Sequence, residues 1–247
     1  MAQTILILGA TSAIAHAYAR LKAAEGAGFV LVGRRADALE ANAADLRARG
    51  AAQVTVIEAD LADISMIEPN ASRCVAPKFP DEVLLAYGSL GDQPKALGDV
   101  AYAREVIDTN FTSAALWLLA LAKLRPAAQG ATFLVIGSVA GDRGRGSNFV
   151  YGAAKGALER VVEGLQHGNA GTPAHFVLIK PGFVDTPMTD GIPNKGGPLW
   201  AKPEAVAADI AKAAKAGKSS LYTPWFWWPI MTIIRNLPRP IFNKLKI

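Results

Sequence analysis

The sequence predicts an α/β fold in which one parallel β-sheet carries helices on both faces, a doubly wound arrangement. Short, continuous apolar runs alternate with Ala-rich segments long enough to be helices, and this order persists along most of the chain. Runs that are apolar at every residue are typical of buried parallel strands. Strand–helix–strand order of this kind favours a single sheet with ligands at the carboxyl ends of its strands.

Six apolar runs are the expected strands, and Gly, Asp or Pro stand close to their ends. They are Ile5–Leu8, Phe29–Val32, Val54–Ile57, Val83–Ala86, Phe133–Ile136 and Phe176–Ile179. The segments between them that are long enough for crossover helices are Ile14–Glu25, Ala36–Gly50, Val100–Arg125 and Tyr151–Gly168. No linker-like stretch or repeat interrupts this order, so we expect residues 1–247 to form a single domain.

Composition excludes several classes of protein. With 51% hydrophobic and 19% charged residues among 247, the chain can bury enough apolar surface to exclude disorder. Its single cysteine, Cys74, excludes an internal disulfide and suits a reducing, cytoplasmic compartment, where we expect it to be a small, semi-buried hydrophobe. His16, His167 and His175 lack ligand spacing, so no metal site is expected. We expect neither a cleavable leader nor a membrane span of ~20 residues.

The net charge of +5 is unevenly distributed. Residues 195–247 contain nine Lys or Arg and two acidic residues, a balance of +7, whereas residues 1–194 contain 17 basic and 19 acidic residues, a balance of −2. A near-neutral body argues against a nucleic-acid groove across the fold. The basic end favours a local anionic partner near the C-terminus.

A turn of small residues, Gly9-Ala10-Thr11-Ser12-Ala13-Ile14-Ala15, follows the first strand. Glycine at a strand exit permits a tight turn, and the N-terminus of the next helix offers N–H groups and a positive dipole end to a pyrophosphate. Ala13 and Ala15 stand where a dinucleotide fingerprint has glycine. On this motif alone, an ordinary strand–turn–helix is equally compatible with the sequence.

The second expected strand ends in Val32-Gly33-Arg34-Arg35, with no carboxylate to bind the ribose 2′-hydroxyl of NAD. Two guanidinium groups favour a 2′-phosphate, and hence NADP(H), because Arg binds phosphate through charge-assisted bonds. The alternative is a solvated basic loop. After the third strand, Asp60 is expected either to accept a bond from the adenine amino group or to cap a helix.

Ser138 follows the fifth expected strand, and Tyr151 and Lys155 stand thirteen and seventeen residues further on. Tyr151 and Lys155 are four residues apart and share one helix face. We expect the Lys155 ammonium to lower the pKa of the Tyr151 phenol and make it an acid–base group, while Ser138 binds a substrate oxygen. A half-buried Tyr beside a solvated Lys is the alternative for that pair alone.

Taken together, these motifs resemble the short-chain dehydrogenase/reductase family over nearly the whole chain, with Ser138, Tyr151 and Lys155 as the most specific match. The resemblance implies a Rossmann-type fold, a nicotinamide cofactor and a catalytic tetrad of Asn110, Ser138, Tyr151 and Lys155. In it, Asn110 would hold a water in a proton relay and Lys155 would also bind the nicotinamide ribose. The cofactor-binding set that we assign is Gly9, Thr11, Ser12, Ala13, Ile14, Arg34, Arg35, Asp60, Leu61, Ala86, Tyr87, Gly88, Tyr151, Lys155, Pro181, Gly182, Val184 and Thr186.

The resemblance also divides the chain by role. Residues 1–188 would form the cofactor-binding and catalytic core, and residues 189–247 the substrate loop, the last helix and strand, and a Trp-rich basic tail. The segment Ala86-Tyr87-Gly88-Ser89 replaces the family's Asn-Asn-Ala-Gly, so the sheet-stabilising role of that motif is not carried over.

Two stretches, residues 141–152 and 234–245, resemble a subgroup within the family, the decaprenylphosphoryl-2-keto-pentose reductases. The likeness implies reduction of a 2-keto pentose on a polyprenyl-phosphate carrier, with a flavoprotein oxidase as a partner. A homo-oligomer is also expected. The same chemistry on another lipid ketone, such as a 3-oxoacyl thioester or a sterol, is the nearer alternative, and a non-catalytic dinucleotide sensor or scaffold is the alternative of another class.

Near the C-terminus, Trp225–Ile234 concentrates three of the five tryptophans, and Arg235, Arg239, Lys244 and Lys246 follow. Indoles and cations favour the surface of an anionic bilayer, so we expect a peripheral location on the inner face of the plasma membrane. A dimer interface or a lid over the site is the alternative.

Overall fold

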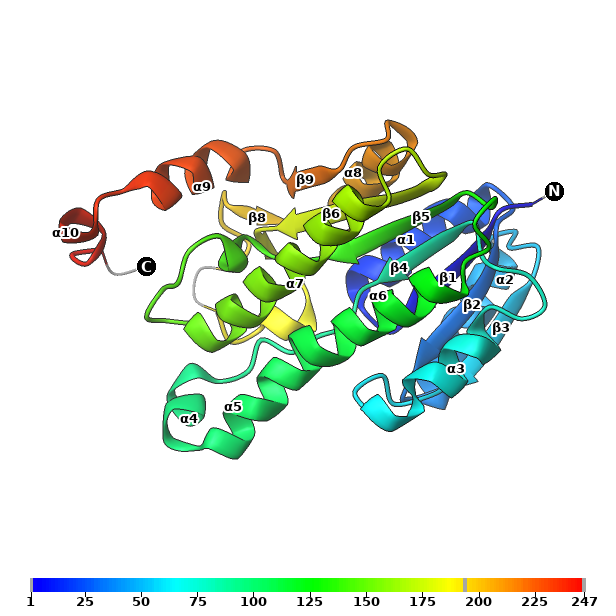
Figure 1. Cartoon of the computed structure of the whole chain (residues 1–247), viewed down its shortest axis with the longest axis horizontal. Coiled ribbons are helices and arrows are strands. Elements are labelled where there is room, and N and C mark those ends of the chain that lie inside the picture. The colour runs from blue at the N-terminus through cyan, green and yellow to red at the C-terminus, as the bar shows by residue number, and fades with distance from the viewer. Residues whose placement is uncertain (1, 193–194, 246–247) are drawn as a thin grey trace.

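The structure is a computed structural model that describes residues 2–192 and 195–245. Its main sheet has seven parallel strands in the order β3-β2-β1-β4-β5-β6-β9 (Figure 1). They are β1 (Thr4–Leu8), β2 (Gly28–Gly33), β3 (Val54–Glu58), β4 (Glu82–Leu85), β5 (Ala131–Ile136), β6 (Ala174–Pro181) and β9 (Ser220–Thr223). The predicted fold class is confirmed, and the six expected strands are present.

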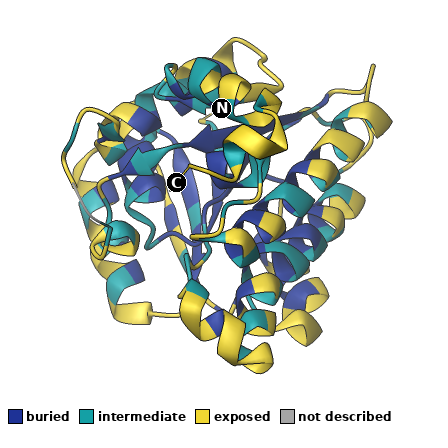
Figure 2. Cartoon of the chain, turned by 90° about the vertical axis from the view of Figure 1, so that its left-hand side faces the viewer, coloured by how far each residue is buried: buried dark blue, intermediate teal, exposed yellow. Residues whose placement is uncertain are grey.

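Two apolar cores lie on opposite faces of this sheet, because alternate residues of a strand point to opposite sides. In β1, Ile5 and Ile7 enter one core, with α1 (Ala13–Ala24), α2 (Ala36–Ala48) and α8 (Pro203–Lys215). Leu6 and Leu8 enter the other, with α3 (Ile67–Cys74), α6 (Ser113–Leu124) and α7 (Phe149–Gly168). Figure 2 shows the buried strands between helices whose outer faces are exposed.

The segment expected as one helix over Val100–Arg125 is divided into α5 (Val100–Ile107), a π-helical turn (Asp108–Thr112) and α6. The wider turn brings Asn110 fully into the interior, where its Nδ2 donates to the carbonyl oxygen of Val106 at 2.8 Å. π-helical turns often occur at functional sites. A short helix α4 (Gln93–Gly98) precedes this segment.

Cys74 is 2% exposed and so lies deeper than the semi-buried position that the sequence suggests, and burial raises its pKa to about 12. None of the helices in the described ranges is long and apolar enough to cross a bilayer.

The chain ends in what we call the C-terminal arm, residues 225–245, which contains α9 (Trp227–Asn236) and α10 (Arg239–Phe242). Only part of Trp225–Ile234, which we expect to contact a membrane or another surface, is exposed. Trp227 and Met231 face inward and are 4% and 0% exposed, because α9 is amphipathic and these two residues share one face. Trp225, Trp228 and Ile233 are exposed. Lys246 lies outside the described residues.

Candidate active site

Ser138 and Tyr151 meet at the carboxyl end of β5. Ser138 begins the short 3-10 turn η3 (Val139–Asp142), and its Oγ accepts a bond from the backbone N–H of Ala140 at 3.1 Å. Tyr151 lies in the first turn of α7, is 9% exposed and packs with Ala140 of the η3 turn, beside the Ser138 side chain. The structure therefore brings together a half-buried hydroxyl and a buried phenol.

Lys155 lies one turn further along α7 and is also buried, at 4% exposure. Its Nζ donates to the carbonyl oxygen of Ile136 at 2.9 Å and lies 5.9 Å from the centre of the Tyr151 ring. Burial lowers the pKa of Lys155 to about 8. The ammonium is consequently a proton donor with a pKa close to neutrality, held at the end of β5.

The expectation that Lys155 lowers the pKa of Tyr151 is wrong for this structure. Burial raises the pKa of Tyr151, and the nearby Ser138 side chain offsets only part of that effect. The physical reason is that removing a phenolate from water opposes its charge more strongly than one neutral hydroxyl favours it. The phenol is thus held in its proton-donating form.

Asn110 adjoins this group through the loop that follows β4. Its Nδ2 donates to the carbonyl oxygen of Ser89 at 2.7 Å, and its Oδ1 accepts from the Ser89 N–H at 3.1 Å. A Cβ on Gly88 would lie 2.5 Å from this Oδ1 and 3.6 Å from Nζ of Lys155. Gly88 therefore lets the loop pass directly beside Asn110 and Lys155. Ala86, before it, is buried at the end of β4.

The residues of the first turn lie at the same edge of the sheet. Gly9 has φ +87°, a conformation that residues with a side chain rarely adopt. A Cβ at this position would also lie only 2.7 Å from Cβ of Tyr87, so both backbone and space require glycine. The phenol of Tyr87 is hydrogen-bonded to Ser113 at 2.9 Å. Within the described chain, the Ser12 side chain does not cap α1. The first turn of α1 begins with Ala13 and Ile14, directly after Thr11 and Ser12. Its N–H groups therefore suit a pyrophosphate.

Arg34 and Arg35 follow β2 and are both exposed. Nε of Arg34 lies 4.0 Å from Oδ1 of Asp60, which also accepts from the Ala62 N–H at 3.0 Å. Asp60 thus stabilises its own turn. The carbonyl oxygen of Leu61 accepts from the buried Trp117 indole at 3.1 Å.

The loop after β6 forms the other wall. Pro181 ends β6, and Val184 belongs to a short strand β7 (Phe183–Val184) that pairs with β8 (Trp200–Ala201). Thr186 follows and donates its N–H to Oγ1 of Thr189 at 3.2 Å. Gly182 packs against the Trp227 indole, whose Nε1 has no hydrogen-bond partner among the described residues.

A cavity of about 640 Å³ opens beside Gly88. The β4–α4 loop lines one side of it, and Met188, Gly191 and Ile192 line the other. Its volume suits an organic ligand of moderate size. In the described ranges, no three His, Cys, Asp or Glu side chains are grouped as metal ligands.

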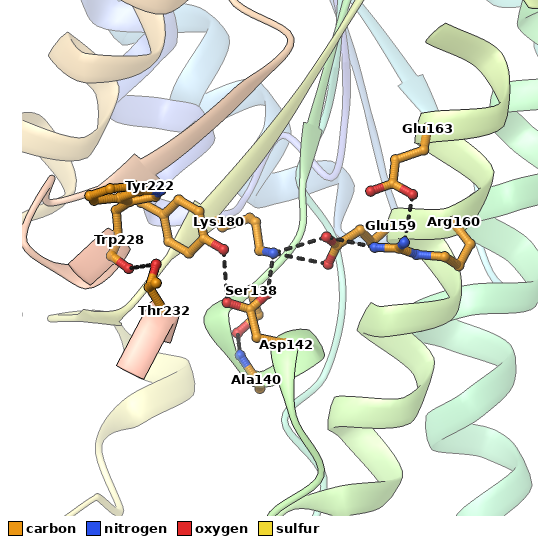
Figure 3. Close-up of polar contacts among 10 residues, drawn as sticks. All are labelled: Ser138, Ala140, Asp142, Glu159, Arg160, Glu163, Lys180, Tyr222, Trp228 and Thr232. Atoms are coloured by element: carbon orange, nitrogen blue, oxygen red, sulfur yellow. Dashed lines mark hydrogen bonds and ion pairs between the residues drawn. The ribbon is translucent and has the colours of Figure 1, made fainter. Parts of the chain in front are cut away.

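Sequence reasoning missed a buried polar network near Ser138 (Figure 3). Lys180, Asp142 and Glu159 form its centre, and the hydroxyl of Tyr222 donates to Oδ2 of Asp142 at 2.9 Å. One signal was present in the sequence: Lys180 directly follows the continuous apolar run Phe176–Ile179, where a buried charge requires a partner.

The fold and the Ser–Tyr–Lys site define an oxidoreductase of the doubly wound α/β class. A family model described as short chain dehydrogenase matches residues 3–196. An uncharacterised oxidoreductase of Mycobacterium tuberculosis is 37% identical over 99% of this chain and 97% of its own. The 1-deoxy-11-beta-hydroxypentalenate dehydrogenase of Streptomyces exfoliatus is 31% identical over 88% of this chain and 82% of its own. The chain belongs to the short-chain dehydrogenase family.

The solved structures agree with this fold. A short-chain dehydrogenase from Burkholderia cenocepacia in complex with NADP superposes with a TM-score of 0.82 at 18% identity, over 100% of this chain and 98% of that one.

Proposed function

We propose that the chain uses NADPH to reduce a ketone to a secondary alcohol. The placement of buried Tyr151 beside Ser138, with buried Lys155 and Asn110 next to them, carries this proposal. NADP(H) is supported by the exposed Arg34 and Arg35 after β2 and by the uncapped first turn of α1. The dinucleotide would lie along the assigned set from Gly9 to Thr186, and its nicotinamide supplies the hydride.

The protein's residues would handle the proton. Tyr151 donates its phenolic hydrogen to the ketone oxygen, because burial keeps the phenol protonated until charge develops on that oxygen. The Ser138 hydroxyl donates to the same oxygen and orients it. The Lys155 ammonium, 5.9 Å from the centre of the Tyr151 ring, would stabilise the phenolate that this transfer leaves. Asn110 holds the neighbouring loop through its two bonds to Ser89.

For the substrate, we propose a keto sugar linked to a polyprenyl phosphate. The C-terminal arm supports this class, since Val139 packs with Trp227 and Met231 and so joins the arm to the Ser138 turn. The outer side of the arm exposes Trp225 and Trp228, at 75% and 61%. A membrane-bound lipid substrate would be approached along such a surface. A peripheral membrane location, a flavoprotein oxidase partner and a homo-oligomer belong to the same proposal.

A second candidate is an alicyclic lipid ketone or alcohol, which the similarity to the pentalenate dehydrogenase of Streptomyces exfoliatus supports. Both candidates share the same site chemistry and differ in the molecule that fills the cavity.

The test follows NADPH absorbance with the purified chain and separate panels of keto sugars, lipid-linked keto sugars and alicyclic ketones. Ketone-dependent oxidation that Tyr151→Phe abolishes is expected, with NADPH binding measured by fluorescence left intact. A chain that binds NADPH yet reduces no panel member would be a dinucleotide sensor, and the proposal would be wrong.

A further inference from the structure

Lys180 is the buried charge that the proposed reaction does not use. It lies in β6 directly before Pro181, and its side chain is 3% exposed. Its Nζ forms an ion pair with Asp142, whose side chain is fully buried, and lies 3.0 Å from both carboxylate oxygens of Glu159. Although burial alone would lower the pKa of Lys180, its bonds to Asp142, Tyr222 and Glu159 raise that pKa, so the ammonium stays charged.

The two carboxylates come from the same two elements that supply Ser138 and Tyr151. Asp142 ends the η3 turn that Ser138 begins. Glu159 is eight residues after Tyr151 in α7 and four after Lys155, so all three lie on one buried helix face. The η3 turn therefore meets α7 at two successive levels. At one level Ala140 packs with Tyr151. At the other, Lys180 joins Asp142 to Glu159 (Figure 3).

We propose that Lys180 is a positioning residue: by pairing with Asp142 and Glu159 at once, it holds the η3 turn against α7 at the separation that lets the Ser138 hydroxyl meet the Tyr151 phenol. The inference rests on the proposed function for the catalytic roles of those two residues.

The contacts around Lys180 are consistent with a role in holding the η3 turn and α7 at a fixed separation. Each carboxylate has a second partner on its far side, Tyr222 for Asp142 and Arg160 for Glu159, whose Nη2 lies 2.8 Å from Oε1. Buried ion pairs add little stability compared with apolar residues of similar size, yet loss of one partner is strongly destabilising. Without the ammonium, the two carboxylates would repel each other and push η3 away from α7.

A spectroscopic readout tests this arrangement without cofactor or substrate. The full chain labelled with ¹³Cζ-tyrosine contains five tyrosines, and Tyr151→Phe identifies the Tyr151 signal. Ser138→Ala provides the reference shift for loss of the hydroxyl beside Tyr151. In Lys180→Met and Asp142→Asn, we expect the Tyr151 signal at pH 7 to move in the direction seen for Ser138→Ala. Arg160→Gln, which removes the exposed partner of Glu159 and does not touch Asp142, is the matched control and should leave it in place.

Kinetics give the second readout. Displacement of a reacting group by about 1 Å costs on the order of a hundredfold in rate, so kcat of Lys180→Met should fall by about that factor, with the ketone KM and the NADPH Kd nearly unchanged. A Tyr151 signal in Lys180→Met that coincides with wild type, while Ser138→Ala moves it, would overturn the proposal. If Lys180→Met does not fold, the near-isosteric variant Asp142→Asn tests the proposal instead, through the same comparison of its Tyr151 signal with those of wild type and Ser138→Ala. If the chain reduces no ketone, the spectrum still decides on Lys180, and the proposed function alone fails.

Discussion

The indole of Trp227 lies directly against Gly182, and the contact leaves no room for a Cβ on that glycine. Trp227 also contacts Phe183, with the two ring centres 5.4 Å apart and the rings nearly perpendicular. The C-terminal arm is thereby fixed to the loop after β6, the wall of the candidate site.

This contact predicts the effect of Gly182→Ala. The added methyl group must displace the indole or the loop, and overpacking of this kind costs ~1–3 kcal/mol in the free energy of unfolding. Urea denaturation measures the loss. Gly144→Ala is the control, because a Cβ at Gly144 would meet nothing within 4 Å among the described residues. Equal stability of the two variants would show that the loop gives way without cost.

Cofactor preference is predicted from the two guanidinium groups after β2. Each charge-assisted hydrogen bond contributes ~1.5–3 kcal/mol, so the chain should prefer NADPH over NADH at least about tenfold. Arg34→Ala combined with Arg35→Ala should weaken NADPH binding and leave NADH binding nearly unchanged, as measured by fluorescence titration. Arg47→Ala together with Arg49→Ala, at the other end of α2, removes equal charge as a control. Equal wild-type affinities for the two cofactors would contradict the prediction.

Tyr151→Phe keeps the ring and removes the acid, so turnover should collapse while the NADPH Kd stays the same. Ser138→Ala should lower kcat by several hundredfold at most, roughly the effect of losing one oxyanion donor. Stopped-flow reduction of a reactive ketone measures both. Full activity in the phenylalanine variant would assign the proton to another group.

The pKa of Lys155 predicts a dependence of stability on pH. Its ordinary value is 10.5 and burial lowers it to about 8, so between these values the unfolded chain binds the proton that the folded chain has lost. Lys155 therefore contributes a rise in the free energy of unfolding across this window, of at most ~3.4 kcal/mol at 1.36 kcal/mol per pH unit. The Cys74 thiol, whose pKa burial raises from 9.0, opposes this rise above pH 9.

Lys155→Met should abolish this rise, which denaturation at pH 7, 8.5 and 10 measures. Lys212→Met, on the exposed side of α8, removes a lysine without burial and should keep the rise. A Lys155→Met variant with the same pH slope as wild type would show that another group titrates there.

The C-terminal arm is predicted to bind anionic vesicles more strongly at low salt, because its exposed cations are screened as ionic strength increases. Vesicle binding should be abolished in a variant that combines Trp228→Ser, Ile233→Ser, Arg235→Gln and Arg239→Gln. Each cation removed should cost ~1 kcal/mol of binding free energy. Trp227 is kept because it is buried. Lys212→Gln with Lys215→Gln on α8 removes the same charge elsewhere. If the wild-type protein does not bind vesicles at low salt, the exposed side of the arm would instead contact a second protein surface. Sedimentation would detect such an association.

The strands could be predicted because buried parallel strands leave continuous apolar runs, as in β1 and β5. The edge strand β9 could not be located from Ser220–Thr223, which is short and only partly buried. The division of the expected helix at Asn110 was also missed, since a π-helical turn depends on the interior contacts of that side chain rather than on propensity.

For the site, local spacing revealed Tyr151 and Lys155, which share a helix face. The Lys180 network could not be assembled from the sequence, because its partners Asp142, Glu159 and Tyr222 are brought together only by folding. The pKa of Tyr151 was misjudged for a similar reason: the spacing gives a neighbouring charge but not the depth of burial.

Cys74 can serve as a chemical probe of local unfolding in this chain. It is the one thiol in the sequence, it is 2% exposed in α3, and its raised pKa suppresses the reactive thiolate. A maleimide dye should therefore label only those molecules in which α3 has detached from the sheet. The labelling rate, measured by mass spectrometry, would report how often α3 detaches from the sheet. A lower rate in the presence of NADPH would show how strongly the dinucleotide stabilises that face of the protein.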